Sequence, residues 1–256
     1  MKTKWQCKQS FDAIVFDCDG TLSRIEGIDE LAEMNKVGAE VKALTASAMG
    51  EKGLTTELYE ERLKRVQPTS AQLSMLAELY FEHVTPFAST VIQDFQLLDK
   101  AVYILSAGLL PSVQYFGHYL GVPPENIFAV DVAFDEKTGA YQDFDRKSPL
   151  TTSHGKADIL KQLRKQHNRI VLIGDGMNDA LSAHEADCFI GFGGNFHRPI
   201  ICGHSHFYIK TCSLLPVLPL CVAENEVIGI APVESDYRQA LKAFERGEVE
   251  LGDKYI

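Results

Sequence analysis

The sequence predicts an α/β fold in which a doubly wound parallel sheet carries helices on both faces. Two observations lead to this prediction. Five short runs of β-branched and aromatic residues are apolar along their whole length, as strands buried on both faces of a parallel sheet are. Segments with helical patterns separate most of these runs, and such alternation is typical of doubly wound sheets. The predicted strands are 13–16 (AIVF), 101–105 (AVYIL), 127–130 (IFAV), 170–173 (IVLI) and 188–192 (CFIGF).

The interval after the first predicted strand departs from this alternation. Between residues 23 and 86 we find helix-like segments and no strand pattern; the segments are GIDELAEMN, GAEVKALTASAM, TTELYEERLKRV and SAQLSMLAELYFEHV. Thr69 and Ser70 stand where the N-cap of the last helix is expected. These helices are too many for one crossover between strands. We therefore expect a small helical cap at 23–86, inserted into a core formed by 1–22 and 87–256.

The rest of the core continues with helices between strands. Residues 156–166 (KADILKQLRKQ) place Ile159, Leu160 and Leu163 on one face of a helix. A C-terminal extension begins at about residue 220 and contains a predicted helix at 235–246. The pattern leaves open whether this extension packs on the core or joins two chains in a homodimer.

Composition narrows the function classes. The chain has 256 residues, is 45% hydrophobic and 23% charged, and carries a net charge of -10, with a pI of about 5.3. Such a surface repels phosphate backbones, so we expect no nucleic-acid partner. The start of the chain lacks an apolar leader, and two prolines break LLPVLPLCVA, so we expect no membrane association. Six cysteines without CxxC spacing indicate reduced thiols and a cytoplasmic protein.

Polar side chains gather where three predicted strands end. Asp17 follows the first strand and Asp19 lies two residues later, Ser106 follows 101–105, and Asp175 and Asp179 follow 170–173. Because the carboxyl ends of parallel strands meet at one edge of the sheet, we expect these side chains to lie together. The glycine-rich turns around them let backbone N–H groups approach an anion closely.

Four carboxylates at one edge need compensating positive charge or protons. An all-oxygen ligand set favours Mg²⁺, which binds carboxylates together with a substrate phosphate. Lys156 begins a predicted helix and can supply a second positive charge. Taken singly, DCDGT could form an Asx turn, GDGMND an incomplete calcium loop, Ser106 a helix cap, and Lys156 a surface lysine. Their joint placement favours a site for phosphoryl chemistry.

The segments DCDGT (17–21), SAG (106–108), GK (155–156) and GDGMND (174–179) resemble the four motifs of the haloacid dehalogenase superfamily. Within it, the chain is similar to phosphoserine phosphatases through EGIDELA (26–32), AMG (48–50), ERL (61–63), GAYQDFD (139–145) and ADCFIGFGGN (186–195). The resemblance extends from about residue 11 to about residue 218. It implies a Rossmann-like core and hydrolysis of O-phospho-L-serine to L-serine and phosphate through an aspartyl-phosphate.

The resemblance also implies a role for each motif residue. Asp17 would be the nucleophile, and Asp19 would protonate the departing serine oxygen and then activate water. Ser106 would hold phosphoryl oxygens, and Lys156 would neutralise charge and orient Asp17. Mg²⁺ would bind Asp17, the carbonyl of Asp19, and Asp175, with Asp179 in support.

Substrate selection is assigned by the same resemblance to the cap. Glu26 would receive the substrate ammonium and Arg62 the carboxylate. Arg65 competes for the second role, but ERL favours Arg62; the plain alternative for YEERLKR is a solvated helix face. Ala107 replaces a usual glycine and Thr55 a usual phenylalanine, and both changes bear on the leaving group that is accepted. Further substrate-binding positions are Met49, Ser106, Ala107, Gly108 and Asn178.

Three alternatives remain beside this prediction. The chain could hydrolyse another small phosphomonoester, such as a phosphorylated amino alcohol or a nucleoside monophosphate. It could also be a non-catalytic binding protein built on a former enzyme scaffold. Finally, a zinc site is conceivable in FHRPIICGHSHF, but packing of loop and strand is the default because no second ligand pair has zinc spacing; the residues concerned are His197, Cys202, His204 and His206.

Overall fold

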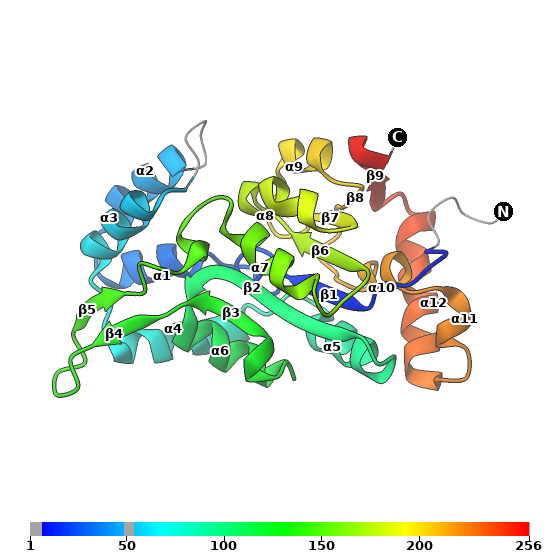
Figure 1. Cartoon of the computed structure of the whole chain (residues 1–256), viewed down its shortest axis with the longest axis horizontal. Coiled ribbons are helices and arrows are strands. Elements are labelled where there is room, and N and C mark those ends of the chain that lie inside the picture. Colours follow the sequence, from blue (N-terminus) through cyan, green and yellow to red (C-terminus); the bar gives the residue numbers. More distant parts are fainter. Residues whose placement is uncertain (1–6, 49–53, 256) are drawn as a thin grey trace.

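The computed structural model describes residues 7–48 and 54–255 of the chain (Figure 1). Within them lies a seven-stranded sheet with strand order β3-β2-β1-β6-β7-β8-β9. Neighbouring strands are parallel from β3 to β8, and β9 is antiparallel to β8. The strands are β1 (Ala13–Phe16), β2 (Ala101–Leu109), β3 (Ile127–Val130), β6 (Ile170–Gly174), β7 (Cys188–Phe192), β8 (Phe207–Ile209) and β9 (Val249–Leu251). The predicted fold class is confirmed.

Helices cover both faces of this sheet, as a doubly wound fold requires. In Figure 1, α5 and α6 lie on one side of the sheet and α8 and α9 on the other. The core helices are α5 (Ala88–Leu97), α6 (Leu110–Tyr119), α7 (Gly155–Leu163), α8 (Met177–Ser182), α9 (Pro199–His204), α10 (Val217–Cys221), α11 (Glu224–Val227) and α12 (Ala231–Glu245). Short 3₁₀ helices lie at Pro124–Asn126, Pro149–Thr151, Ala183–Glu185 and Asp253–Tyr255.

Four helices follow β1 and precede α5, and we call them the helical insert. They are α1 (Gly27–Met34), α2 (Gly38–Ala48), α3 (Thr56–Val66) and α4 (Ser70–Glu82). Local signals set their starts: Thr55 caps α3 by accepting a hydrogen bond from the Leu58 N–H, and Thr69 forms a capping box with Gln72 at α4. The insert forms one end of the molecule (Figure 1). A two-stranded hairpin of β4 (Val132–Phe134) and β5 (Tyr141–Phe144) lies beside it.

The two connections between the insert and the core run side by side. Ser23 and Val84 form an antiparallel bridge, and the Thr85 N–H donates to the Leu22 carbonyl at 2.9 Å. The side-chain amide of Asn195 donates to the Gly20 carbonyl at 3.0 Å and to the Thr85 hydroxyl at 2.8 Å. Asn195 thus ties the loop after β1 to the return of the chain into the core.

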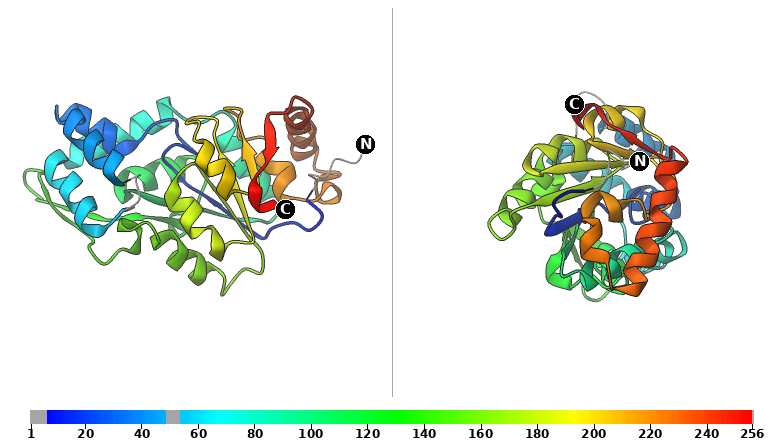
Figure 2. Two further views of the ribbon diagram at one scale, coloured as in Figure 1. Left: turned by 90° about the horizontal axis from the view of Figure 1, so that it is seen from above. Right: turned by 90° about the vertical axis from the view of Figure 1, so that its right-hand side faces the viewer.

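The C-terminal extension packs on the core of its own chain. Helix α12 lies against α10 and α5, with Val233 and Tyr237 buried. Strand β9 then pairs with β8 and lengthens the sheet. In Figures 1 and 2, α12 lies at the opposite end of the molecule from α2 and α3. Pro232 stands in the first turn of α12 and starts the helix at Ala231 instead of the predicted residue 235.

The centre of the sheet is fully apolar. Every residue of β1 is inaccessible to solvent, and Cys18, directly beyond it, is buried as the alternation of an extended segment predicts. Among the described residues, no helix combines the length and apolar character needed to cross a membrane.

Candidate active site

The ends of β1, β2 and β6 open into a cavity of about 1080 Å³ between the sheet and the helical insert. Side chains from all three strand ends line it together with side chains from the insert; they include Asp17, Asp19, Glu26, Arg62, Lys156 and Asp175. The expected convergence of the strand ends therefore takes place, and the insert contributes a second wall.

Three carboxylates form a buried trio at the base of this cavity. One oxygen each of Asp17, Asp175 and Asp179 lies within 4.8 Å of the other two. The three residues are 8%, 2% and 0% exposed. Burial, together with the nearby charge of Asp179, raises the pKa of Asp17 well above its ordinary value. Burial and the charge of Glu26 raise the pKa of Asp175 in the same way.

Lys156 supplies the trio with a buried positive charge. It is the second residue of α7, and its Nζ lies 2.7 Å from Oδ1 of Asp17 and 2.6 Å from Oδ1 of Asp179. Burial by itself lowers the pKa of this ammonium group, but the two carboxylates outweigh burial and raise it. Lys156 is 3% exposed, so the alternative of a surface lysine is wrong.

Asp19 has different surroundings, although it lies only two residues from Asp17. Its Oδ1 accepts hydrogen bonds from the Gly27 N–H at 2.6 Å and the Tyr80 hydroxyl at 2.7 Å, and its Oδ2 accepts one from the Ser106 hydroxyl at 3.3 Å. Burial raises its pKa, which favours the protonated form. The two acids therefore lie in different environments: a cationic side chain contacts Asp17, whereas neutral hydrogen-bond donors contact Asp19.

Residues 106–108 lie in the last part of β2, where its register with β3 shifts between Leu105 and Leu109, and we call this irregular segment the phosphate turn. Ser106 is 1% exposed, and its Oγ accepts a hydrogen bond from the Gly108 N–H at 2.9 Å. No side chain caps α6, so the alternative that Ser106 is a helix cap is wrong. A Cβ on Gly108 would lie 2.9 Å from Oδ2 of Asp19, which shows how closely the turn approaches the acid.

Gly20 is required by the loop after β1. Its φ of +74° lies in the left-handed region, and a Cβ there would lie within 2.5–2.7 Å of the Asp175 carboxylate. The next residue, Thr21, donates from its hydroxyl to Oδ1 of Asp175 at 3.3 Å. The DCDGT segment is thus held against the GDGMND segment.

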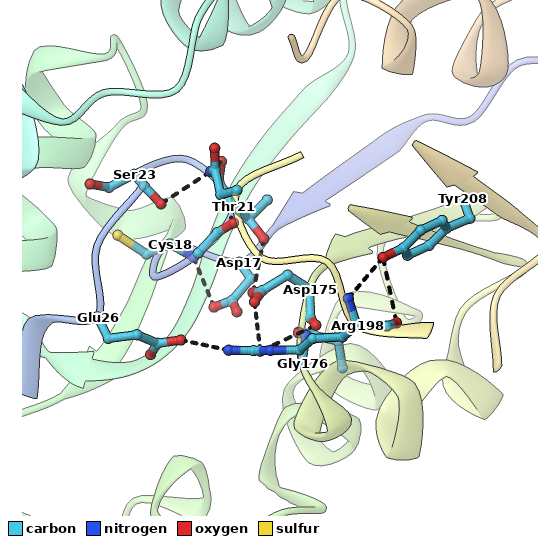
Figure 3. Close-up of polar contacts among 12 residues, drawn as sticks. Asp17, Cys18, Thr21, Ser23, Glu26, Asp175, Gly176, Arg198 and Tyr208 are labelled. Atoms are coloured by element: carbon cyan, nitrogen blue, oxygen red, sulfur yellow. Dashed lines mark hydrogen bonds and ion pairs between the residues drawn. The ribbon is translucent and has the colours of Figure 1, made fainter. Parts of the chain in front are cut away.

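Arg198 is a site residue that the sequence analysis missed. Its Nη1 lies 2.6 Å from Oδ2 of Asp175 and its Nη2 lies 3.0 Å from Oε1 of Glu26. Figure 3 shows the guanidinium between the two carboxylates. Tyr208 of β8 holds the backbone in place, because its hydroxyl accepts from the Arg198 N–H at 3.1 Å. The segment GGNFHRPII contained a signal for this residue, because it places a cation in the loop after β7, at the same edge of the sheet as the acids.

Glu26 is buried beside this arginine. Burial and the charge of Asp19 raise the pKa of Glu26 to about 7, and Arg198 opposes the shift. The carboxylate therefore changes charge near neutral pH.

Arg62 of α3 faces the same cavity from the insert. Its guanidinium lies 5.6 Å from the centroid of the Tyr59 ring. Among the described residues, its Nε is a buried donor without a hydrogen-bond partner. Arg65, in contrast, is exposed on the surface and pairs with Glu40 at 3.0 Å and Glu61 at 3.8 Å. The structure thus brings Arg62, and not Arg65, to the cavity.

The remaining predicted positions fall into two groups. Ala107, Gly108 and Asn178 line the cavity. Met49 lies outside the described residues.

The histidine- and cysteine-containing segment after β7 forms helix α9 and the start of β8. Nδ1 of His206 accepts a hydrogen bond from the Phe189 N–H at 3.1 Å, which ties the ring to β7. Within residues 7–48 and 54–255, the acidic trio is the group of side chains with metal-ligating geometry.

The trio suits a hard divalent cation. All donors are carboxylate oxygens, which is the ligand chemistry of Mg²⁺. Among the described residues that line the cavity, six are acidic and three are lysine or arginine, so positive charge is in deficit. The lining acids are Asp17, Asp19, Glu26, Glu57, Asp175 and Asp179, and the cations are Arg62, Lys156 and Arg198.

Comparisons with known proteins agree with this geometry. Residues 11–187 match the model of the haloacid dehalogenase-like hydrolases. The phosphoserine phosphatase of Homo sapiens is 35% identical over 202 residues, which cover 78% of this chain and 89% of the relative. That of Drosophila melanogaster is 32% identical over 204 residues, covering 78% and 75%.

Solved structures show the same fold. A structure described as a phospho-aspartyl intermediate analogue of phosphoserine phosphatase has a TM-score of 0.70 and 25% identity, covering 83% of this chain and 98% of that one. A substrate-bound phosphoserine phosphatase complex has a TM-score of 0.71 and 24% identity with the same coverage.

Proposed function

Because the chain belongs to the haloacid dehalogenase-like hydrolases and, within them, to the phosphoserine phosphatase family, we propose that it is a Mg²⁺-dependent phosphomonoesterase that hydrolyses O-phospho-L-serine to L-serine and phosphate. The observation that carries the proposal is a single cavity lined by the acidic trio, by Arg62 with an unsatisfied buried donor, and by Glu26. Arg62 and Glu26 match the carboxylate and the ammonium of phosphoserine, and the trio would match its phosphate once Mg²⁺ is bound.

In the first step we assign Asp17 as the nucleophile. Its Oδ1 lies 2.7 Å from Nζ of Lys156 and accepts a hydrogen bond from the Cys18 N–H at 2.8 Å. The lysine fixes the orientation of the carboxylate and favours its ionised form, against the burial that raises its pKa. The Asp17 carboxylate attacks phosphorus, the new oxygen–phosphorus bond forms, and the bond to the serine oxygen breaks. The product on the protein is an aspartyl-phosphate.

Asp19 moves the proton in both steps. Its raised pKa favours the protonated acid, which gives its proton to the departing serine oxygen. As a carboxylate, it then takes a proton from a water molecule whose oxygen attacks phosphorus. The bond to Asp17 breaks, phosphate leaves, and both acids return to their starting states. Tyr80 and Gly27 hold Asp19 in position throughout.

The phosphate turn and Lys156 bind the phosphoryl oxygens as charge develops on them. Asp17, Asp175 and the carbonyl of Asp19, with Asp179 in support, would hold Mg²⁺. When bound, Mg²⁺ supplies positive charge that neutralises these carboxylates and the phosphoryl group.

In this proposal, residues 23–86 act as a cap that selects the substrate. Arg62 binds the substrate carboxylate as a bidentate partner, and Glu26 binds the ammonium group. Met49, Ala107, Gly108 and Asn178 complete the substrate site. A cytoplasmic location stays a prediction from the sequence.

A substrate panel tests the proposal. Initial rates of phosphate release are compared on phosphoserine, phosphothreonine, phosphoethanolamine and nucleoside monophosphates, with Mg²⁺ present. We expect a clear preference for phosphoserine, and equal or better rates on another substrate would reject the substrate assignment. Ala107 in the phosphate turn and Thr55 beside the cavity make phosphoethanolamine the rival to examine first.

The chemistry is tested separately from the substrate. Phosphate release is expected to vanish in EDTA and in Asp17→Asn, which keeps the shape of the side chain but removes the nucleophilic carboxylate. Release that survives Asp17→Asn rejects the assigned nucleophile. If the wild-type protein releases no phosphate from any substrate of the panel, the alternative of a binding protein is favoured instead.

A further inference from the structure

Tyr59 connects the helical insert to the phosphate turn. It lies on α3, is 2% exposed, and its hydroxyl donates a hydrogen bond to the Ala107 carbonyl at 3.0 Å. Its ring packs against the ring of Phe144, with centroids 5.3 Å apart. One side chain from the insert thus reaches a backbone atom in the irregular last part of β2.

The hydrogen bond acts on a peptide group whose other end faces Ser106, the neighbour of Asp19. In a trans peptide the carbonyl and the N–H that follows it point in opposite directions within one plane. Holding the Ala107 carbonyl therefore sets the direction of the Gly108 N–H. That N–H donates to Oγ of Ser106 at 2.9 Å, and the Ser106 hydroxyl donates to Asp19 at 3.3 Å. The contacts run without a break from Tyr59 to Asp19.

The ring of Tyr59 serves the opposite end of the cavity. The Arg62 guanidinium lies 5.6 Å from its centroid, within the range of a cation–π contact. The Nε of Arg62 has no hydrogen-bond partner among the described residues, so no hydrogen bond at this atom competes with the ring in orienting the guanidinium. Tyr59 therefore touches both the group that faces the carboxylate end and the turn that faces the phosphoryl end.

Other contacts hold α3 against the core without Tyr59. The hydroxyls of Thr56 and Thr151 lie 2.9 Å apart, and Leu54 exchanges hydrogen bonds with Ser153. Glu60 receives Arg146 in a bidentate ion pair at 2.7 and 2.9 Å. Removing the Tyr59 hydroxyl alone leaves these contacts in place, so its effect on the turn can be measured in a folded protein.

We propose that Tyr59 is a positioning residue that couples the two ends of the substrate site: its hydroxyl orients the phosphate turn and its ring orients Arg62. The proposal rests on the proposed function for the identity of the carboxylate end. If Tyr59 has this role, turnover depends on the position of α3 relative to the core. The hydrogen bond from Tyr59 to Ala107 is then a link between the cap and the core.

The test compares Tyr59→Phe, Tyr59→Leu and a matched control on phosphoserine and phosphoethanolamine. Tyr59→Phe removes only the hydroxyl, and we expect kcat to fall about tenfold on both substrates, because the Ala107 carbonyl loses its buried partner, while KM stays within about twofold. Tyr59→Leu also removes the ring, so KM should rise about tenfold for phosphoserine and remain unchanged for phosphoethanolamine, which has no carboxylate.

The control is Tyr103→Phe, which removes a hydroxyl bonded to His167 at 2.7 Å from a side chain that is 6% exposed. Both phenylalanine variants should lower the melting temperature similarly, but Tyr103→Phe should leave kcat within about twofold of the wild type. A Tyr59→Phe variant with wild-type kcat overturns the link to the turn. An equal rise of KM on both substrates in Tyr59→Leu overturns the link to Arg62.

These failures differ from failure of the proposed function. If the wild type does not prefer phosphoserine, the substrate assignment falls. The kcat of Tyr59→Phe is then measured on the best substrate of the panel, where a tenfold loss supports the link to the turn and an unchanged kcat overturns it.

Discussion

Arg62→Ala is the sharpest test of the carboxylate site. The guanidinium faces the cavity, and its Nε has no hydrogen-bond partner among the described residues, so a substrate carboxylate would pair with a charge that is already desolvated. Removing one partner of a buried, hydrogen-bonded charge pair costs about 2–5 kcal/mol. With about 1.4 kcal/mol per factor of ten, kcat/KM on phosphoserine should fall between about 30-fold and about 3000-fold.

The assay pairs each variant with a substrate that lacks the group Arg62 is proposed to bind. On phosphoethanolamine, which has no carboxylate, Arg62→Ala should leave kcat/KM within about threefold of the wild type. Arg62→Lys keeps the charge but loses the bidentate geometry, so it should fall between the wild type and Arg62→Ala on phosphoserine. Arg65→Ala is the control on the same helix, because Arg65 is exposed and pairs with Glu40 and Glu61; it should change little on either substrate.

Equal losses on both substrates would refute the reasoning, because the effect would then not depend on the carboxylate. A loss in Arg65→Ala as large as in Arg62→Ala would likewise show that the other arginine, or the fold of α3, controls activity.

Three further predictions concern charge. Glu26 has a pKa of about 7, so its ionised fraction rises about tenfold from pH 6 to pH 8; KM for phosphoserine relative to an amine-free phosphomonoester should fall by that factor, and a ratio that still falls in Glu26→Gln contradicts the assignment. Burial and nearby Asp236 raise the pKa of Asp94 from 3.8 to about 7. The folded state therefore favours the protonated form of Asp94. The contribution of this group to the free energy of unfolding is complete below pH 3.8 and is lost as the pH rises to 7. The total loss is about 4 kcal/mol. In urea unfolding, the free energy of unfolding of Asp94→Asn should rise relative to that of the wild type by about this amount between pH 4 and pH 8. A difference between the two proteins that stays constant with pH would reject the prediction. Lys156→Met leaves two buried carboxylates without their cation and should cost about 3–5 kcal/mol of unfolding free energy. Adding Asp179→Asn should recover part of this loss, and no recovery would mean that the cost is one of packing.

The main strands could be predicted because their signal is local. Residues 13–16 and 170–173 lie between two covered faces, so each is apolar throughout and can be recognised without knowing its neighbours. Strands β8 and β9 have three residues each, and they form through pairing of β8 with β7 and of β9 with β8. The hairpin strands β4 and β5 have three and four residues. Such strands carry too few residues for a periodic pattern.

Some residues of the candidate site could likewise be predicted from the sequence, and others could not. The approach of Asp17, Asp175 and Ser106 follows from parallel topology, because each lies at or near the carboxyl end of a strand of the same sheet. Arg198 and Glu26 meet across 172 residues of chain, and Tyr59 reaches Ala107 across 48. No spacing rule connects such pairs, since a loop and a helix bring them together.

The fold class, the helical segments after β1 and the set of acids at the sheet edge could be predicted without a structure, because periodicity and strand ends are properties of neighbouring residues. The difference between those acids became visible only in the folded chain. Lys156 gives Asp17 a cationic partner, whereas Tyr80, Gly27 and Ser106 surround Asp19 with neutral donors. The pKa of a buried group depends on desolvation and on charges a few ångströms away, and those distances exist only once the chain has folded.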